Sequence, residues 1–359
     1  MAAAAARTPW WAWAWPLLAW AVLISTIVAG TGGVIAAAAG LILIMTVFAA
    51  VYHAEVVAHR IGEPYGTLVL AVAVTVIEVA LIVSVMLGAP DKAGLARDTV
   101  FASVMIACNG IVGLCLLAGG VRHHEQGFQL EGASAALAVL AALTTLTLIL
   151  PNVTVAAPGP TFSTSQLVFA GVISLVLYGS YVFVQTVRHR GYFLPVKGKS
   201  KKAPAAPSDR TALVSALLLL VALVAVVGLA KALTPTLEIA VSYLDVPKAV
   251  VGVVIALLVL LPEGLAALRA ARANQLQTSL NLALGSALAS IGLTIPTVAV
   301  VSIVLGQPLE LGLGAKDEVF LAVTLVVGVI TLGTGRTTVL QGIVHLVNFA
   351  AFLFLTVLP

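Results

Sequence analysis

Runs of apolar residues long enough to cross a lipid bilayer constrain this chain more than any other feature. The run from residue 66 to residue 88 reads GTLVLAVAVTVIEVALIVSVMLG and contains a single charged residue, Glu78. A helix that spans the hydrocarbon core needs about 20 such residues. Charged residues make up 9% of the whole chain, whereas a soluble domain carries about 25%. The sequence therefore predicts a polytopic membrane protein without a sizeable domain outside the membrane.

Eleven runs of this kind follow one another along the chain. They are continuously apolar and lack the two-residue alternation of a membrane barrel, which favours helices over strands. We therefore expect an all-α membrane protein of about 11 transmembrane helices. The predicted helices cover residues 10–29, 33–57, 66–88, 98–120, 132–150, 164–187, 211–233, 248–268, 279–305, 318–334 and 338–358.

The first run carries all five tryptophans of the chain near its start. Tryptophan is enriched where a helix crosses the membrane interface. A cleaved signal peptide is the alternative, but no small-residue cleavage site precedes a polar start of a mature chain. We expect residues 1–30 to form an N-terminal transmembrane helix. The two cysteines, Cys108 and Cys115, lie on one run and indicate no disulfide framework.

The longest polar stretch, residues 188–210, carries seven Lys and Arg residues against one acid, Asp209. Basic loops stay on the cytoplasmic side, so we expect this linker to be cytoplasmic. Counting spans outward from it puts the N-terminus inside and the C-terminus outside. The eleven basic residues beyond the linker then divide six to five between the two sides. The net charge of +4 reflects this topology. We therefore expect the protein to interact with the lipid bilayer and not with nucleic acid.

The basic linker also separates two sets of five predicted helices, residues 31–187 and residues 211–359. An odd number of helices per half forces the second half to enter the membrane upside down relative to the first. This is the architecture of inverted-repeat transporters, in which the substrate site lies near the membrane midplane.

One acid lies on the second helix of each half, Glu78 in the first and Glu263 in the second. A carboxylate inside the membrane must bind a proton or a cation, because burial and a neighbouring like charge both disfavour its ionised form. Ca²⁺ takes about 6–8 oxygen ligands, of which two glutamates supply up to four. We expect Asn109 and Ser286, on the following helices, to be auxiliary ligands. Pro262 is expected to break its helix and free a backbone carbonyl.

Three more oxygen-bearing side chains are candidate auxiliary ligands. Thr75 lies one turn before Glu78, Ser290 lies one turn after the predicted ligand serine, and Glu63 lies in the loop HRIGEPYG. Helix packing is the alternative role for the serine and simple solvation the alternative for Glu63. We expect His345, inside the last predicted helix, to be a hydrogen-bonded structural histidine.

Long strings of the sequence resemble bacterial calcium/proton antiporters of the ChaA type, in the calcium:cation antiporter superfamily. They include HRIGEPYGTLVLAVAVTVIEVALIVSVML and LPEGLAALRAARANQLQTSLNLALGSALASIGLTIPTV. The resemblance implies that Glu78 and Glu263 carry cation and protons in turn, with Asn109 and Ser286 as auxiliary ligands. Commoner relatives have a Gly-Asn pair before each acid and a histidine after the second, whereas these stretches read VTVIE and LLPEG. Members of the subgroup that this chain resembles are also associated with Na⁺ and K⁺ exchange, so the resemblance implies these ions as well as Ca²⁺.

We expect a secondary active transporter of the bacterial inner membrane that exchanges cytoplasmic Ca²⁺, and also Na⁺ or K⁺, for external protons by alternating access. No cofactor is expected, and the sequence sets no oligomeric state. One alternative is a monovalent Na⁺(K⁺)/H⁺ antiporter on the same fold. A different class is an intramembrane enzyme that uses paired acids, but neither an HExxH nor a GxSxG motif is present.

Overall fold

The structure is a computed structural model that describes residues 8–62, 65–86, 93–195, 206–244, 247, 249–307 and 309–358. The chain divides into two compact units, and each unit draws residues from both predicted halves of the sequence. The first unit comprises Met1–Ala89 and Lys201–Asp245, and the second comprises Pro90–Ser200 and Val246–Pro359. The sequence predicts a division into consecutive segments, with boundaries at residues 30, 187 and 210, and this division stays a prediction.

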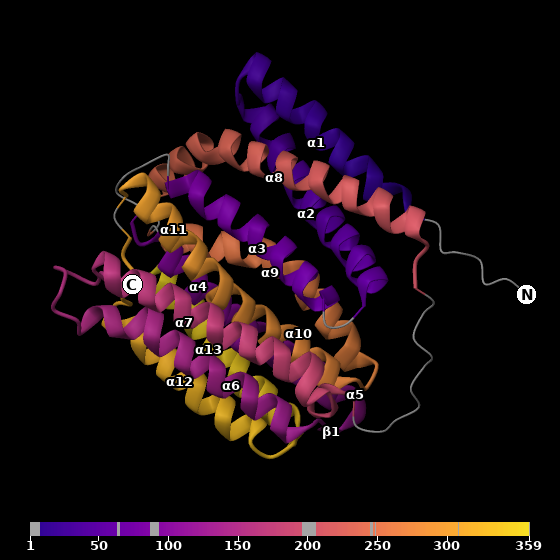
Figure 1. Ribbon diagram of the computed structural model, residues 1–359, viewed down its shortest axis with the longest axis vertical. Helices are drawn as coiled ribbons and strands as arrows, with labels where there is room; N and C mark the ends of the chain where they lie inside the picture. The colour runs from indigo at the N-terminus through magenta and orange to yellow at the C-terminus, as the bar shows by residue number, and fades with distance from the viewer. Residues whose placement is uncertain are drawn as a thin grey trace, which may run out of the picture. The chain divides into compact units, whose positions relative to one another are not determined.

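The first unit consists of four helices in the described residues, and α8 packs against the other three (Figure 1). These helices are α1 (Trp10–Ala29), α2 (Gly33–Ile61), α3 (Tyr65–Met86) and α8 (Asp209–Leu244). His53 is fully buried, and its Nε2 lies 2.9 Å from the carbonyl oxygen of Ala12. Trp20 donates its indole N–H to the carbonyl oxygen of Val221 over 3.1 Å. Side-chain bonds to backbone therefore join α1 to both α2 and α8.

The second unit contains the remaining helices and one short sheet. Two of its longest helices contain a π turn in their middle, so three labelled elements make one continuous helix in each case. The first is α4 (Leu95–Met105), η1 (Ile106–Ile111) and α5 (Val112–His123); the second is α10 (Leu276–Ala289), η6 (Ser290–Thr294) and α11 (Ile295–Leu305). π turns are rare and occur frequently at functional sites.

The other helices of the second unit follow the predicted runs closely. They are α6 (Leu130–Thr144) with η2 (Thr145–Ile149) and η3 (Leu150–Asn152), α7 (Thr164–Phe183) with η4 (Val184–Arg188) and η5 (Arg190–Phe193), α9 (Ala249–Arg272), α12 (Ala315–Leu332) and α13 (Val339–Val357). Capping boxes begin α7 at Ser163 and α13 at Thr338. Each box satisfies backbone N–H groups that a helix start leaves without partners.

The prediction of an all-α membrane fold with eleven helices is confirmed. Joining the helices across their π turns gives eleven long helices in the described residues. Nine spans among these residues are long and apolar enough to cross a membrane, and α3 adds a shorter apolar stretch, Val69–Val83. Several helices extend beyond the predicted ends. α8 continues beyond residue 233 through Pro235 to Leu244, and α9 continues through two arginines to Arg272.

Loops of the second unit pair in two groups, which lie at opposite ends of its helices. After α5 and after α12, strands β1 (Gln126–Gly127) and β2 (Arg336–Thr337) pair antiparallel. At the other end, Thr161 before α7 bridges Glu310 before α12. Each group contains loops that the predicted alternation of spans assigns to the same side of the membrane. Which group faces the cytoplasm stays a prediction.

Candidate cation site

Glu78 lies in the middle of α3, in the first unit, and is buried with 1% of its surface exposed. The helix around it is apolar because the membrane selects for such residues, so the acid is placed where a charge is costly. Thr75 lies one turn earlier on the same face and is also buried. The predicted pair of a carboxylate and a nearby hydroxyl therefore shares a buried stretch of α3.

Glu263 and Ser286 lie in the second unit, on α9 and α10, and the structure brings them together. The Ser286 hydroxyl donates to Oε2 of Glu263 over 2.7 Å. Both side chains are partly buried. α9 and α10 pack against each other, so the short loop after Arg272 returns the chain to lie alongside its acid. Two residues that were predicted separately from the sequence thus form one hydrogen-bonded pair.

Pro262 does not break α9, contrary to the expectation from the sequence. The helix runs without interruption from Ala249 to Arg272 with the proline inside it. Proline nevertheless has no N–H, so the carbonyl of Leu258, four residues earlier, lacks its helical donor. Leu258 lies five residues before Glu263, which is about 1.4 turns along the helix and roughly 140° around it. The proline therefore leaves a carbonyl without a helical partner inside an intact helix.

The π turn η6 begins at Ser290, one turn after Ser286. Ser290 is buried, and so is Thr294 at the end of the turn. Gly292 lies between them and allows α7 to approach closely, because a Cβ at this position would lie 2.7 Å from Cβ of Tyr178. The small residues of this segment thus combine a widened turn with tight packing against α7.

Asn109 lies inside η1, the other π turn, and is fully buried. Its Nδ2 donates to the Thr324 hydroxyl over 2.8 Å. Its Oδ1 accepts from Nδ1 of His345 over 3.2 Å and from Nδ2 of Asn348 over 3.1 Å. We call Asn109, Thr324, His345 and Asn348 the amide cluster. Both lone pairs of the Asn109 oxygen are engaged in it, so binding a cation there requires one of these bonds to open.

Close packing of glycines explains how α13 reaches Asn109. A Cβ on Gly342 of α13 would lie 2.5 Å from the backbone N of Leu117, and one on Gly113 of α5 would lie 2.9 Å from Leu346. Small residues at such contacts let transmembrane backbones approach. His345 is therefore a hydrogen-bonded residue of the helix interface, as the sequence predicted.

Thr324 and Asn348 were not identified from the sequence. Thr324 is 1% exposed and lies in a charge-free run of α12. In the sequence both stand out only as polar residues in apolar runs. Such residues commonly join transmembrane helices and do not by themselves indicate a site. Only the fold shows that they converge on Asn109.

Glu63, the remaining candidate ligand, lies outside the described residues. Within the described residues, no three His, Cys, Asp or Glu side chains gather as a preformed metal-binding group. Each compact unit contributes one of the two predicted acids. The chemistry available in the second unit is a carboxylate with a donating hydroxyl, which suits an exchangeable cation or proton.

Relatives of known sequence cover nearly the entire chain. The sodium/calcium exchanger protein family matches residues 31–187 and 214–358. The y4hA protein of Sinorhizobium fredii is 50% identical over 362 aligned positions, which cover 99% of this chain and 98% of that protein. The sodium-potassium/proton antiporter ChaA of Escherichia coli is 37% identical over 322 positions, which cover 87% of this chain and 85% of ChaA.

Solved structures share the fold at low sequence identity. Native YfkE matches with a TM-score of 0.74 and 17% identity, and the match covers 97% of this chain and 100% of YfkE. The H⁺/Ca²⁺ exchanger CAX matches with a TM-score of 0.71 and 15% identity, over 96% of this chain and 87% of CAX. At these identities the likeness establishes the fold alone.

The sequence relatives and the family match point the same way. ChaA and the matched family are transporters, which supports a transporter over the intramembrane enzyme that the sequence left open. The family match covers more than half of the chain, and the identity to ChaA extends over most of it. The chain therefore belongs to the sodium/calcium exchanger protein family, as an integral membrane calcium:cation antiporter of the ChaA type.

Proposed function

We propose that this protein exports Ca²⁺, and also Na⁺ or K⁺, from the cytoplasm in exchange for external protons. Glu78 and Glu263 bind cation and proton in turn during alternating access. Ser286 serves as an auxiliary ligand, with Thr75 and Ser290 as further candidates. The protein works in the bacterial inner membrane with its N-terminus inside and its C-terminus outside.

The hydrogen bond from Ser286 to Glu263 carries the proposal. It joins the acid that is proposed to carry cation and proton to the hydroxyl that is proposed as its auxiliary ligand, and the two side chains come from different helices. A hydroxyl that donates to a carboxylate stabilises the ionised form, which is the form that binds a cation. When the acid is protonated, the same hydroxyl can accept. The pair can therefore stay intact in both states of an exchange cycle.

Competition for the same oxygen atoms couples the two ions. A cation binds the deprotonated carboxylate, so its binding releases protons, and protonation expels it. If each of the two glutamates gives up one proton, a divalent cation is exchanged for two protons without net charge movement. Reversal potentials measured in proteoliposomes test this ratio, and a value that requires three protons per Ca²⁺ contradicts it.

The oxygen inventory fits a hard cation whose shell is completed by water. Ca²⁺ takes about 6–8 oxygens at roughly 2.3–2.6 Å. Within the second unit the Glu263 carboxylate gives up to two oxygens and the Ser286 hydroxyl gives one. The Asn109 oxygen is a reserve ligand, because the amide cluster already uses it.

Two observations support an inverted repeat of residues 31–187 and 211–359. The family match falls in two stretches, 31–187 and 214–358. In each half the third long helix contains a π turn, η1 in the first and η6 in the second. Polar residues that follow each acid, Asn109 and Ser290, lie in these two turns. An inverted repeat places equivalent turns at equivalent depth in the membrane.

Uptake of ⁴⁵Ca²⁺ into everted membrane vesicles with an imposed proton gradient tests the proposal. We expect the wild type to accumulate Ca²⁺, and Glu78→Gln and Glu263→Gln each to abolish accumulation. Glu131→Gln, at an exposed glutamate in the first turn of α6, is the matched control and is expected to transport normally. Retained transport by either site variant contradicts the role of that glutamate.

A monovalent antiporter on the same fold is the second candidate, and one observation favours it. ChaA, the relative at 37% identity, is named as a sodium-potassium/proton antiporter. Flux of each ion in the presence of the others separates the candidates. We expect Ca²⁺ to inhibit Na⁺ flux and Glu263→Gln to remove both fluxes. Na⁺ or K⁺ flux that Ca²⁺ leaves unchanged favours the monovalent antiporter.

A further inference from the structure

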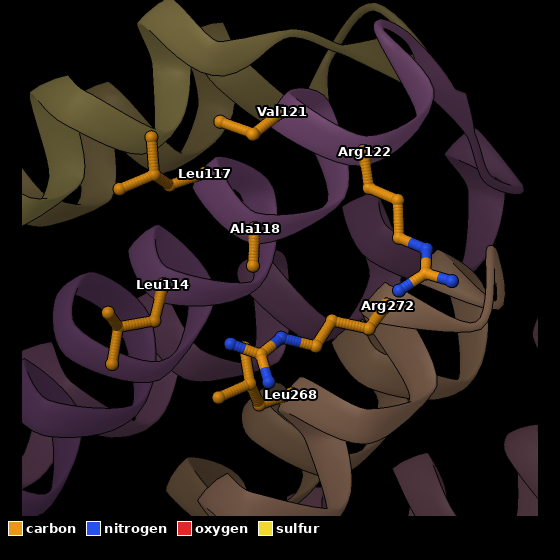
Figure 2. A pocket seen from close by; sticks show the side chains of 7 residues that line it. All are labelled: Leu114, Leu117, Ala118, Val121, Arg122, Leu268 and Arg272. Atoms are coloured by element: carbon orange, nitrogen blue, oxygen red, sulfur yellow. The ribbon is translucent and has the colours of Figure 1, made fainter.

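A pocket of about 550 Å³ opens between the ends of α5 and α9, within the second unit (Figure 2). Its lining combines apolar side chains with two arginines. The lining residues are Leu114, Leu117, Ala118, Val121, Arg122, Leu268 and Arg272. In Figure 2 the Arg122 side chain lies at one side of the pocket, and the Arg272 side chain extends from there below Ala118, so that its guanidinium lies beside Leu268 and toward Leu114. The pocket thus combines two guanidinium groups with apolar side chains of both helices.

The two arginines have exposed side chains and lie in the last turns of their helices. In the described part of the chain, no carboxylate lies within 4.0 Å of either guanidinium. Glu125, the acid nearest to Arg122 in sequence, pairs with Arg336 over 3.3 Å instead. Two guanidinium groups therefore share one pocket without an acidic partner there.

The apolar wall continues deeper along the same two helices. A second pocket of about 140 Å³ shares Leu114 and Leu268 with the first and extends along α9 to Leu257, past Gly264 and Gly110. Leu257 and Leu114 are each 48% exposed, although both are large apolar side chains. Eleven residues separate Leu268 from Leu257, which is about 16 Å along a helix. Half of the hydrocarbon core is about 15 Å thick.

We propose that this groove binds an anionic phospholipid. The phosphate accepts hydrogen bonds from Arg122 and Arg272 at the interface, and one acyl chain lies along α5 and α9 toward the midplane. Arginine suits this role because its planar guanidinium can donate two hydrogen bonds to one phosphate. Basic pockets between transmembrane helices bind anionic headgroups in the same manner.

The combination of features selects a lipid over simpler explanations. Basic residues in a last turn offset the helix dipole, but this does not require arginines of two helices to flank one apolar groove. A free phosphate would use the arginines and leave the leucine-lined wall unused. A phospholipid uses both the arginines and the leucine-lined wall, and its acyl chain matches the groove in depth.

Native mass spectrometry of the purified full-length protein tests the site with added phosphatidylglycerol or phosphatidylcholine. We expect the wild type to retain phosphatidylglycerol in preference to phosphatidylcholine. The double variant Arg122→Gln/Arg272→Gln is expected to bind phosphatidylglycerol about 30-fold more weakly, as expected for the loss of two basic contacts to an anionic lipid. Arg188→Gln/Arg190→Gln removes the same charge from two exposed arginines elsewhere and is expected to bind like the wild type.

A third variant separates a lipid from an anion. Ala118→Phe fills the groove and keeps both arginines, so it is expected to lose phosphatidylglycerol as well. Arg122→Lys/Arg272→Lys keeps the charges and is expected to retain part of the binding, which shows that losses do not come from misfolding. Equal phosphatidylglycerol binding by the wild type and the glutamine double variant overturns the proposal. So does full binding by Ala118→Phe, because the ligand would then use the arginines alone.

Discussion

Two polar groups in the second unit, the Glu263–Ser286 pair and the amide cluster, connect helices in the same membrane environment but differ in charge. The pair consists of one carboxylate and one hydroxyl, and both side chains are partly exposed. The amide cluster is neutral, and every oxygen lone pair of Asn109 is used. A neutral network in which the Asn109 oxygen is fully engaged stabilises a helix interface, whereas a carboxylate can bind a cation or a proton. Polarity alone therefore does not distinguish the proposed transport site from a structural helix interface.

Loss of an acid is expected to have the largest effect. Glu263→Gln or Glu78→Gln should lower the transport rate about 100-fold or more, because removing one charge from a buried ion site costs roughly 3–5 kcal/mol. Glutamine keeps the shape of the side chain, so the unfolding temperature should change little. Initial rates of proton-driven Ca²⁺ uptake measure the effect. A variant that transports at more than half of the wild-type rate would remove its glutamate from the mechanism.

Disruption of the amide cluster is expected to lower stability more than it lowers cation affinity. Asn109→Leu removes three interhelical hydrogen bonds at about 0.6 kcal/mol each, which gives about 2 kcal/mol in the free energy of unfolding. Thermal unfolding in detergent, compared with ⁴⁵Ca²⁺ binding, measures both quantities. An unchanged stability with a large loss of affinity would make Asn109 a cation ligand and would erase the contrast with Glu263.

Removal of the Ser286 hydroxyl is expected to have an intermediate effect, and it should lower cation affinity more than it lowers stability. Ser286→Ala removes a hydrogen bond to a charged group, worth about 1.5 kcal/mol, and so should raise the half-saturating cation concentration about 10-fold. Ser286→Thr keeps a hydroxyl and serves as the control. The concentration dependence of uptake checks this prediction. An alanine variant with wild-type affinity would reduce the hydrogen bond to a packing contact.

A substitution at the edge of the amide cluster should have the smallest effect. Thr324→Val removes the hydroxyl that accepts from Asn109 and Asn348. We expect a loss of about 1 kcal/mol in the free energy of unfolding from two interhelical bonds, with transport unchanged. Unfolding in detergent and vesicle uptake of the same preparation test both parts. Slower transport at unchanged stability would extend the cation site into the cluster.

The sequence was sufficient for the elements and for one of the two polar groups. Apolar runs predicted all eleven helices, since spanning a bilayer requires length and hydrophobicity that are visible residue by residue. Helix ends were placed short where a charge interrupted a run. α9 includes Arg269 and Arg272 because basic side chains at a C-terminal turn reach the interface while the helix continues.

The details of the site depend on geometry that no local pattern carries. The sequence does not indicate the π turns at Asn109 and Ser290, and it shows Gly292 and Gly113 only as small residues, without the close helix contacts that they make. The sequence predicts Asn109 as a cation ligand because it is an amide on the helix that follows an intramembrane acid. Its partners, Thr324, His345 and Asn348, lie more than 200 residues away in the chain. Long-range convergence of this kind appears only in the fold.

Proton release on cation binding tests the central claim most directly. Ca²⁺ is added to the purified protein in weakly buffered detergent solution, and released protons are counted with a pH indicator. The account predicts release of protons by the wild type, an apparent Ca²⁺ affinity that falls as pH is lowered, and smaller release by Glu78→Gln and by Glu263→Gln. Ca²⁺ binding without proton release, or undiminished release by both variants, would contradict it.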